Sequence, residues 1–245
     1  KAIITCDVAV ATTYETLDII ASIFSSAQKE RVKDKFIELP LGYDGKIFFY
    51  DEKLRRETRL ELGIGDGEVA LIVSSRMTPK KIHKGIGRLV TGIAEVMRCQ
   101  INLKTLIVGF DDSEPSHRLR SRIETFDVAD RFLIYGLASR PRLNALFNGS
   151  DIGLFCLCSI SVQEAMGTGL YMILSDDGSM SHLIRSEDQG VFFHAGDERS
   201  LQTALIHAIS QVRNGISRSE RQAANAWLDY SDLSERLFAR LLVEP

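Results

Sequence analysis

One segment of the chain, residues 159–169, combines the residue types that bind a phosphate and a sugar. Its sequence, Ser-Ile-Ser-Val-Gln-Glu-Ala-Met-Gly-Thr-Gly, follows an apolar run at residues 151–158 that predicts a buried strand. A strand that turns straight into a helix brings unpaired N–H groups and the positive end of the helix dipole to one spot, which suits a phosphate. Glu164, in the first turn, suits a neighbouring sugar hydroxyl. The segment therefore predicts a nucleotide-sugar site.

The carboxylate of Glu164 has a second interpretation. Ser161 and Glu164 have the S-x-x-E spacing of a capping box, in which the glutamate bonds the N–H of the serine and fixes the start of the helix. Both roles use the same oxygens. The spacing alone favours the capping role and leaves the ribose-binding role open.

Two basic residues flank the loop after an earlier predicted strand. Arg76 follows this strand directly, and Lys84 begins the next helix. Fixed positive charges at this edge of a parallel sheet can hold a diphosphate and stabilise it as a leaving group. Alternatively, Lys80, Lys81 and Lys84 form a solvated loop and Arg76 pairs with a carboxylate, because basic loops are common.

Other common chemistries find no support in the sequence. It contains no GxxxxGK[ST] or GxGxxG motif, and its scattered histidines form neither HExxH nor a catalytic triad. The pairs Asp111–Asp112 and Asp176–Asp177 each follow a predicted strand, where carboxylates commonly fix turns and cap helices. We therefore expect no metal site and no cofactor.

Composition narrows the class of protein. The 245 residues are 44% hydrophobic and 26% charged, with a net charge of −3, which is typical of a soluble globular protein and disfavours a general nucleic-acid binder. No apolar run is long enough to span a bilayer.

The four cysteines form no CxxC pair, and apolar surroundings predict buried, reduced thiols at Cys6, Cys99 and Cys156. The chain begins at Lys1 inside an apolar pattern, which predicts a fragment of a longer, cytoplasmic protein.

Short apolar runs alternate with longer amphipathic ones from residue 69 onward. This order predicts a doubly wound α/β domain, a Rossmann-like parallel sheet covered by helices on both faces. The expected strands are 69–75, 103–109, 131–135, 152–158, 170–174 and 190–194, and the expected helices are 84–98, 115–126, 139–147, 161–167, 179–186 and 197–212.

The two ends of the chain differ from this pattern. Residues 1–41 predict one small βαβ unit, residues 42–68 a connector, and residues 218–242 one helix, broken or bent near Asp229. We therefore divide the chain into an N-terminal remnant with a hinge (1–45), a nucleotide-sugar-binding domain (46–217) and a C-terminal segment packing back toward the hinge (218–245).

Several blocks of sequence resemble a known family in order and spacing. They are FIELPLGYD (36–44), VSSR (73–76) with HKG (83–85), LIVG (106–109), DRFLIYG (130–136), SDIGLF (150–155), and EAMGTG (164–169) with ILSDDG (173–178). Together they resemble the donor-binding half of the retaining glycosyltransferases of family 4, also called group 1, which have the two-domain GT-B architecture.

The resemblance implies roles for individual residues. Arg76 and Lys84 would hold the donor diphosphate, and Glu164, as the second glutamate of the E-x7-E motif, would bind the ribose. The amides of Ile160, Ser161 and Val162 would face the phosphate or the transferred sugar. The main chain around Leu137 would meet the nucleobase. The family needs no metal.

The resemblance also implies a reaction: transfer of a hexose from a UDP- or GDP-linked donor to a glycan or lipid-linked acceptor, as in surface polysaccharide synthesis. The expected location is cytoplasmic, including the inner face of the membrane. The acceptor would bind the part of the N-terminal domain that these 245 residues lack, so we expect this chain to bind a nucleotide sugar but to transfer it poorly.

The chain departs from the family at two points of the site. Cys156 stands where an ungapped count places the first glutamate of E-x7-E, and Lys84 lies eight positions after Arg76 rather than five, so Lys81 is an alternative. The lost glutamate supports a second hypothesis, a non-catalytic glycosyltransferase-like module. A third hypothesis is a GT-B enzyme with another reaction, either a nucleotide-sugar epimerase or a phosphorylase. A phosphorylase would need a lysine that binds pyridoxal phosphate, and no segment of the sequence indicates one.

Overall fold

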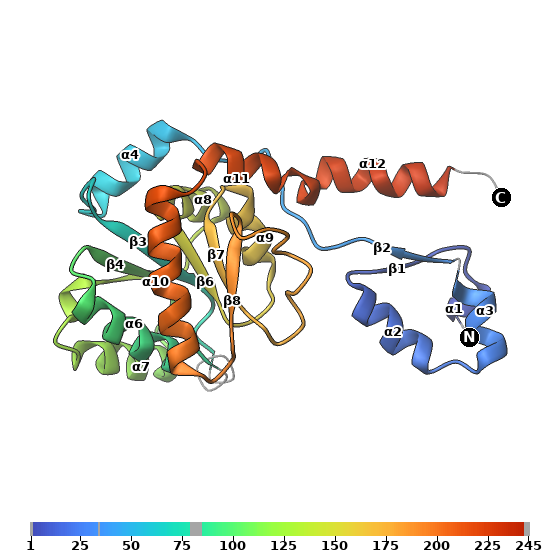
Figure 1. The fold of residues 1–245 in the computed structure, drawn as a ribbon, viewed down its shortest axis with the longest axis horizontal. Coiled ribbons are helices and arrows are strands. Elements are labelled where there is room, and N and C mark those ends of the chain that lie inside the picture. Colours follow the sequence, from blue (N-terminus) through green and yellow to red (C-terminus); the bar gives the residue numbers. More distant parts are fainter. Residues whose placement is uncertain (1, 34, 79–84, 243–245) are drawn as a thin grey trace.

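The computed structural model describes residues 2–33, 35–78 and 85–242 of the chain. Its centre is a six-stranded parallel sheet with the order β5-β4-β3-β6-β7-β8 (Figure 1). Helices cover both faces of this sheet, so the predicted doubly wound α/β fold is confirmed. The chain first builds outward from β3 through β4 to β5, and then returns to β6 on the other side of β3.

The elements in chain order are α1 (Ala2–Thr5), β1 (Ala9–Ala11), α2 (Tyr14–Ser22), α3 (Ser26–Lys33), β2 (Phe36–Glu38), α4 (Glu52–Glu61), β3 (Val69–Ser74), α6 (Gly87–Cys99), β4 (Leu103–Phe110), α7 (Glu114–Glu124), η2 (Ala129–Arg131), β5 (Phe132–Gly136), α8 (Arg140–Gly149), β6 (Ile152–Phe155), α9 (Ile160–Gly167), β7 (Tyr171–Ser175), β8 (Gly190–Phe193), α10 (Glu198–Asn214), α11 (Arg218–Ala224), η3 (Ala226–Leu228) and α12 (Tyr230–Leu241).

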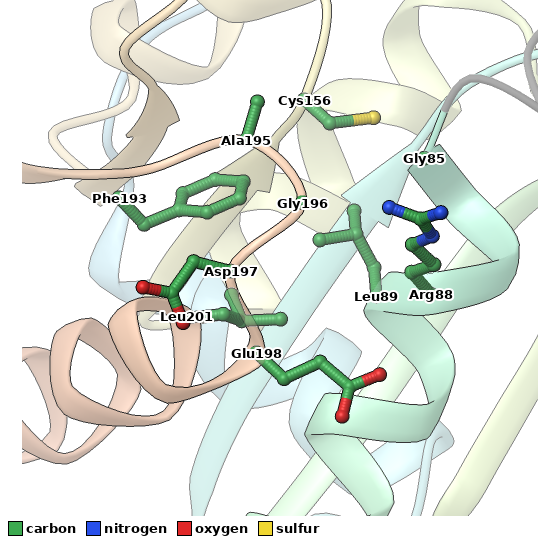
Figure 2. Close-up of a pocket in the computed structure, with 10 residues that line it drawn as sticks. All are labelled: Gly85, Arg88, Leu89, Cys156, Phe193, Ala195, Gly196, Asp197, Glu198 and Leu201. Atoms are coloured by element: carbon green, nitrogen blue, oxygen red, sulfur yellow. The ribbon is translucent and has the colours of Figure 1, made fainter.

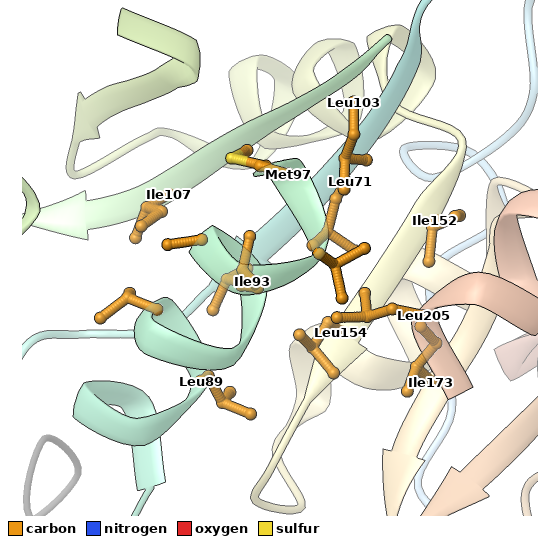
Figure 3. Close-up of a cluster of buried hydrophobic side chains, with 14 of the residues drawn as sticks. Leu71, Leu89, Ile93, Met97, Leu103, Ile107, Ile152, Leu154, Ile173 and Leu205 are labelled. Atoms are coloured by element: carbon orange, nitrogen blue, oxygen red, sulfur yellow. The ribbon is translucent and has the colours of Figure 1, made fainter. Parts of the chain in front are cut away.

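Alternate residues of the strands enter two separate cores. Leu71 of β3 packs with α6 and α10 on one face, while Ile72 packs with α8 and α9 on the other, and neither has exposed surface. Figure 3 shows the first core, where side chains of α6 such as Ile93 lie against the strands. Both faces of the sheet are therefore apolar, which explains the near-continuous apolar runs of its strands.

A separate two-stranded sheet lies near the N-terminus. Strands β1 and β2 pair in parallel, with Ala9 opposite Phe36, and α2 and α3 connect them (Figure 1). The expected βαβ unit is thus present, with two helices in its crossover where the sequence predicted one. This unit contacts the larger domain where the Ser181 hydroxyl donates to Oε1 of Glu15 at 3.1 Å.

The structure corrects two predicted elements. The expected connector at 42–68 contains helix α4, and the expected helix at 179–186 is a series of turns. The C-terminal segment is interrupted at Asp229, as predicted, and its first part is further divided into α11 and η3 before α12 begins. In the turns, the Asp177 carboxylate accepts from the N–H and hydroxyl of Ser179, and Gly178 has φ +88°, so side-chain turn bonds replace a helix.

Two further observations concern the whole described chain. No helix within it is long and apolar enough to cross a membrane. The four cysteines form no disulfide, and Cys99 is exposed, so the burial predicted for that thiol is wrong. Cys99 is the last residue of α6.

Candidate nucleotide-sugar site

A cleft of about 360 Å³ opens at the carboxyl ends of four neighbouring strands. It lies where the strand order reverses, between β4 and β5 on one side of β3 and β6 on the other. In open parallel sheets this reversal leaves a crevice between crossovers that run in opposite directions, and ligands bind there. The cleft is lined by Ser74, Ser75, Arg76, Val108, Gly109, Leu137, Ala138, Leu143, Ser159, Ile160 and Ser161.

Arg76 supplies positive charge to this cleft. It follows β3, is exposed, and has no ion pair or side-chain hydrogen bond with any other described residue. The alternative interpretation, in which it pairs with a nearby carboxylate, therefore finds no support among those residues. A guanidinium at a cleft wall, without a partner among the described residues, can bind the oxygens of a phosphate with two parallel hydrogen bonds.

Gly109 lets the loops after β3 and β4 approach closely beside Arg76. Its φ is +113°, and a Cβ atom there would lie 2.0 Å from the carbonyl oxygen of Ser75. Only glycine tolerates both conditions. The N–H of Met77 donates to the Gly109 carbonyl at 3.4 Å, which ties the segment carrying Arg76 to the end of β4.

The start of α9 supplies backbone donors. The helix begins at Ile160, one residue earlier than predicted, with Ser159 as its N-cap. The amides of Ile160 and Ser161 have no backbone acceptor among the described residues, and both residues line the cleft. The N–H of Val162 instead donates to the Ser159 carbonyl at 3.0 Å, so this amide would reach a ligand only if that bond opened.

Glu164 is buried behind the cleft, and it does not cap the helix. Ser161 lies inside the first turn rather than at the N-cap, so the predicted capping box is absent. The Glu164 side chain is 7% exposed, and its Oε1 lies 3.6 Å from Nε of Arg140 at the start of α8. Burial raises the pKa of Glu164, and the charge of Arg140 opposes this shift. The capping box that does form joins Ser217 and Glu220.

The remaining predicted residues lie at the lip of the cleft or outside the described chain. Leu137, 62% exposed, follows β5 and lines the cleft, which leaves an apolar side chain at its edge. Lys84 and its alternative Lys81 lie outside the described residues. The cleft therefore gathers Arg76, Leu137, Ile160 and Ser161, with Glu164 directly behind.

A second cavity of about 160 Å³ lies between the start of α6 and the loop from β8 to α10. Figure 2 shows Arg88 and Leu89 projecting from α6, and Glu198 and Leu201 from α10. Cys156, at the position of the missing family glutamate, lies in its wall. Sequence reasoning missed Arg88 and Glu198, because neither belongs to a motif and their helices are far apart in the chain.

The acidic pairs serve local structure. Asp111 accepts hydrogen bonds from Ser113 and Ser116 at the start of α7, and Asp176 contacts His194 at the ends of β7 and β8. The bonds of Asp111 hold a turn at a helix start, as the sequence predicted, whereas Asp176 joins the ends of two strands. Across the described ranges, no group of three or more His, Cys, Asp and Glu side chains is placed to hold a metal ion.

The fold and the cleft together define a Rossmann-like domain of the GT-B architecture. Sucrose-phosphate synthase from Thermosynechococcus elongatus superposes with a TM-score of 0.76 at 17% identity, covering 98% of this chain and 59% of that one. The structure of Anabaena Alr3699/HepE in complex with UDP-glucose superposes with a TM-score of 0.75 at 16% identity, covering 96% and 64%. At these identities the likeness shows the fold.

Sequence comparison then gives the family. The family described as "Glycosyl transferases group 1" matches residues 55–226, and the chain belongs to it. A phosphatidyl-myo-inositol mannosyltransferase of Mycobacterium leprae is 27% identical over 203 residues, which are 81% of this chain and 50% of that protein. An alpha-monoglucosyldiacylglycerol synthase of Streptococcus pneumoniae is 21% identical over 158 residues, 63% of this chain and 34% of that protein. The chain thus spans half or less of these relatives.

Proposed function

We propose that this chain is the donor-binding part of a retaining glycosyltransferase that takes a UDP- or GDP-linked hexose. The proposed acceptor is a glycan or a lipid-linked molecule, as in surface polysaccharide synthesis. The observation that carries the proposal is the cleft at the strand-order reversal, which is lined by Arg76, Ile160 and Ser161, with the buried Glu164 on the same helix as the last two. Related proteins support it: one is named a mannosyltransferase, and one neighbouring structure holds UDP-glucose.

Each group of the cleft has a role in this proposal. Arg76 and the positive end of α9 bind the diphosphate and stabilise the charge that develops on it as the bond to the sugar breaks. The Glu164 carboxylate accepts hydrogen bonds from the ribose hydroxyls. Leu137 provides an apolar edge near the nucleobase. The roles of Lys84 and of the Val162 amide remain predictions from the family resemblance.

Calorimetric titration of the 245-residue chain with UDP, GDP and ADP tests the proposal. We expect saturable binding of UDP or GDP, weakened by Arg76→Ala and by Glu164→Gln. A chain that is folded by circular dichroism and binds none of the three would contradict the proposed donor site.

The same titration separates a second candidate function, a non-catalytic module that has lost its donor chemistry. Cys156 favours this candidate, because it lies at the end of β6 where the family resemblance expects a glutamate. If the chain is such a module, we expect it to be folded and to bind none of the three nucleotides. Binding that requires both Arg76 and Glu164 favours the donor site instead.

A further inference from the structure

A buried carboxylate and a half-exposed arginine form an ion pair behind the cleft. Nε of Arg140 lies 3.6 Å from Oε1 of Glu164, and their side chains are 49% and 7% exposed. The two residues come from different helices, α8 and α9, so the contact depends on how these helices pack. Neither the family resemblance nor the spacing along the chain singles out Arg140.

The pair lies next to the groups that line the cleft. Glu164 is three and four residues after Ser161 and Ile160, which places all three on one face of α9. Arg140 is three residues before Leu143, another cleft residue, on one face of α8. Each member of the pair therefore shares a helix face with residues that line the cleft.

The Arg140 guanidinium also packs over an aromatic ring. Its guanidinium carbon lies 5.3 Å from the centre of the Phe48 ring, and Phe48 has no exposed surface. A cation over an aromatic face is attracted by the ring quadrupole, so this contact limits the positions of the guanidinium. Arg140 thus connects Glu164 to the segment that follows the predicted hinge.

Arg140 is the cation that stabilises the ionised form of the Glu164 carboxyl group. Burial raises the pKa of the carboxyl group, and Arg140 is the charged group that lowers it. The arginines of α11, which also packs on α9, reach the other end of that helix: Arg218 donates to the Thr168 carbonyl and Arg221 to that of Gly169. Without Arg140, a buried carboxylate would remain with no described cation beside it.

We propose that Arg140 is a positioning residue that fixes the charge and orientation of the Glu164 carboxylate for recognition of a ribose. Arg140 contacts Oε1, which leaves Oε2 to accept a hydrogen bond from a ribose hydroxyl. This inference rests on the proposed function, because it assigns Glu164 to the ribose of a nucleoside diphosphate. It adds that the ability to distinguish ribose from deoxyribose depends on a residue outside the binding motif.

The test compares a ribonucleoside diphosphate with its 2′-deoxy form, using whichever of UDP, GDP and ADP binds the chain. Calorimetry is run on the unmodified chain and on Arg140→Gln, Arg140→Lys, Glu164→Gln and the double variant Arg140→Gln/Glu164→Gln. Arg142→Gln is the matched control, because Arg142 lies on the same helix but pairs with Glu61 and Tyr135. Thermal melts confirm that each variant is folded.

We expect Arg140→Gln to weaken the ribonucleotide by about tenfold and the deoxynucleotide much less, which corresponds to one charge-assisted hydrogen bond. The loss deepens as the pH falls, because the pKa of Glu164 rises without its partner and the protonated carboxyl group accepts poorly. Arg140→Lys restores part of the affinity. In the Glu164→Gln background, Arg140→Gln has no further effect. Equal losses for both nucleotides, or the same loss in that background, would overturn the proposal.

A measurement without nucleotide separates this inference from the proposed function. Carbon-13 NMR titration of the Glu164 carboxyl group in the unmodified chain and in Arg140→Gln reports the pKa directly. A raised pKa in the variant supports the positioning role even if no nucleotide binds. An unchanged pKa overturns that role, whatever the nucleotide titrations show.

Discussion

Arg76 and Glu164 carry opposite charges in opposite environments. Arg76 is exposed at the cleft wall without a described partner, whereas Glu164 is buried and faces Arg140. A ligand phosphate would gain a strong, charge-assisted bond from Arg76 with little rearrangement. Glu164 is held in place before a ligand arrives, which limits the entropy lost on binding.

At the residue scale, Arg76→Ala is expected to weaken nucleoside diphosphate binding by about 10- to 100-fold, the value of one or two hydrogen bonds to a charged group. Calorimetry measures the change. Arg88→Ala is the matched control, because Arg88 is also exposed but lines the second cavity. The same loss in both variants would show that general positive charge, rather than the position of Arg76, attracts the nucleotide.

Glu164 also predicts a pH dependence of stability. Burial raises its pKa in the folded chain, so folding is favoured by this group below its unfolded pKa, and that contribution is lost as the pH rises through the folded pKa. Relative to the unmodified chain, Glu164→Gln should therefore gain stability as the pH rises above the ordinary pKa of a glutamate, about 4.3, as measured by urea unfolding. The exposed Glu235→Gln serves as the control. A pH-independent difference would contradict the burial effect.

At the scale of elements, the cleft depends on how closely two strand ends approach each other. β3 and β4 pair in register from Val69–Leu103 to Ser74–Val108, and the β4–β5 pairing then shifts between Val108 and Phe110. Gly109 lies in this irregularity and carries the positive φ. The shift places the backbone of Gly109 in the cleft instead of in the ladder.

Gly109→Ala is accordingly expected to destabilise the chain by about 2 to 4 kcal/mol, because strain at positive φ adds to a clash with the Ser75 carbonyl. It should also weaken nucleotide binding, since the segment carrying Arg76 must move. Chemical unfolding and calorimetry measure the two effects. Gly136→Ala is the control at the end of β5, where a Cβ would lie 3.7 Å from its nearest neighbour. A Gly109 variant as stable as this control would show that the loops can relax.

At the scale of the whole molecule, the C-terminal segment is held to the domain by a buried arginine. Arg218 of α11 donates to the carbonyls of Phe147, Asn148, Ser150 and Thr168 at the ends of α8 and α9. Burial lowers the pKa of Arg218, while helix C-terminal carbonyls stabilise the cation. Farther along, Tyr43 exchanges backbone bonds with Leu228 and Tyr230, so the segment also contacts the predicted hinge.

Arg218→Gln should cost about 3 kcal/mol of unfolding free energy, because several buried carbonyls lose a charged donor at once. Urea unfolding measures it. The exposed Arg213→Gln, at the end of α10, tests whether loss of charge alone has this effect. If the two variants unfold alike, the C-terminal segment is held by its apolar contacts rather than by Arg218.

The amino-acid sequence by itself determined the alternation of strands and helices and the fold class. Both depend on local sequence patterns. These are the apolar runs of strands buried on both faces, and helix starts such as Ser113 with Pro115 at the beginning of α7. It missed α4, whose inward-facing residues include Arg55 and Arg59. Both arginines pair with Asp151, more than 90 positions away. Because the buried face of α4 contains these charged residues, apolar periodicity does not predict the helix.

Only the tertiary structure decided how the site is assembled. The sequence placed Arg76, Leu137 and Ser161 after successive strands, at one edge of the predicted sheet, and the observed strand order shows which of these strand ends are neighbours and line one cleft. The sequence alone favoured a cap at Ser161 for the Glu164 carboxylate, and the packing of α8 on α9 gave it Arg140 instead. Local spacing specifies which bonds a side chain can make. The residues that compete to bond with that side chain come from distant parts of the chain, and the folded arrangement decides which of them lies beside it.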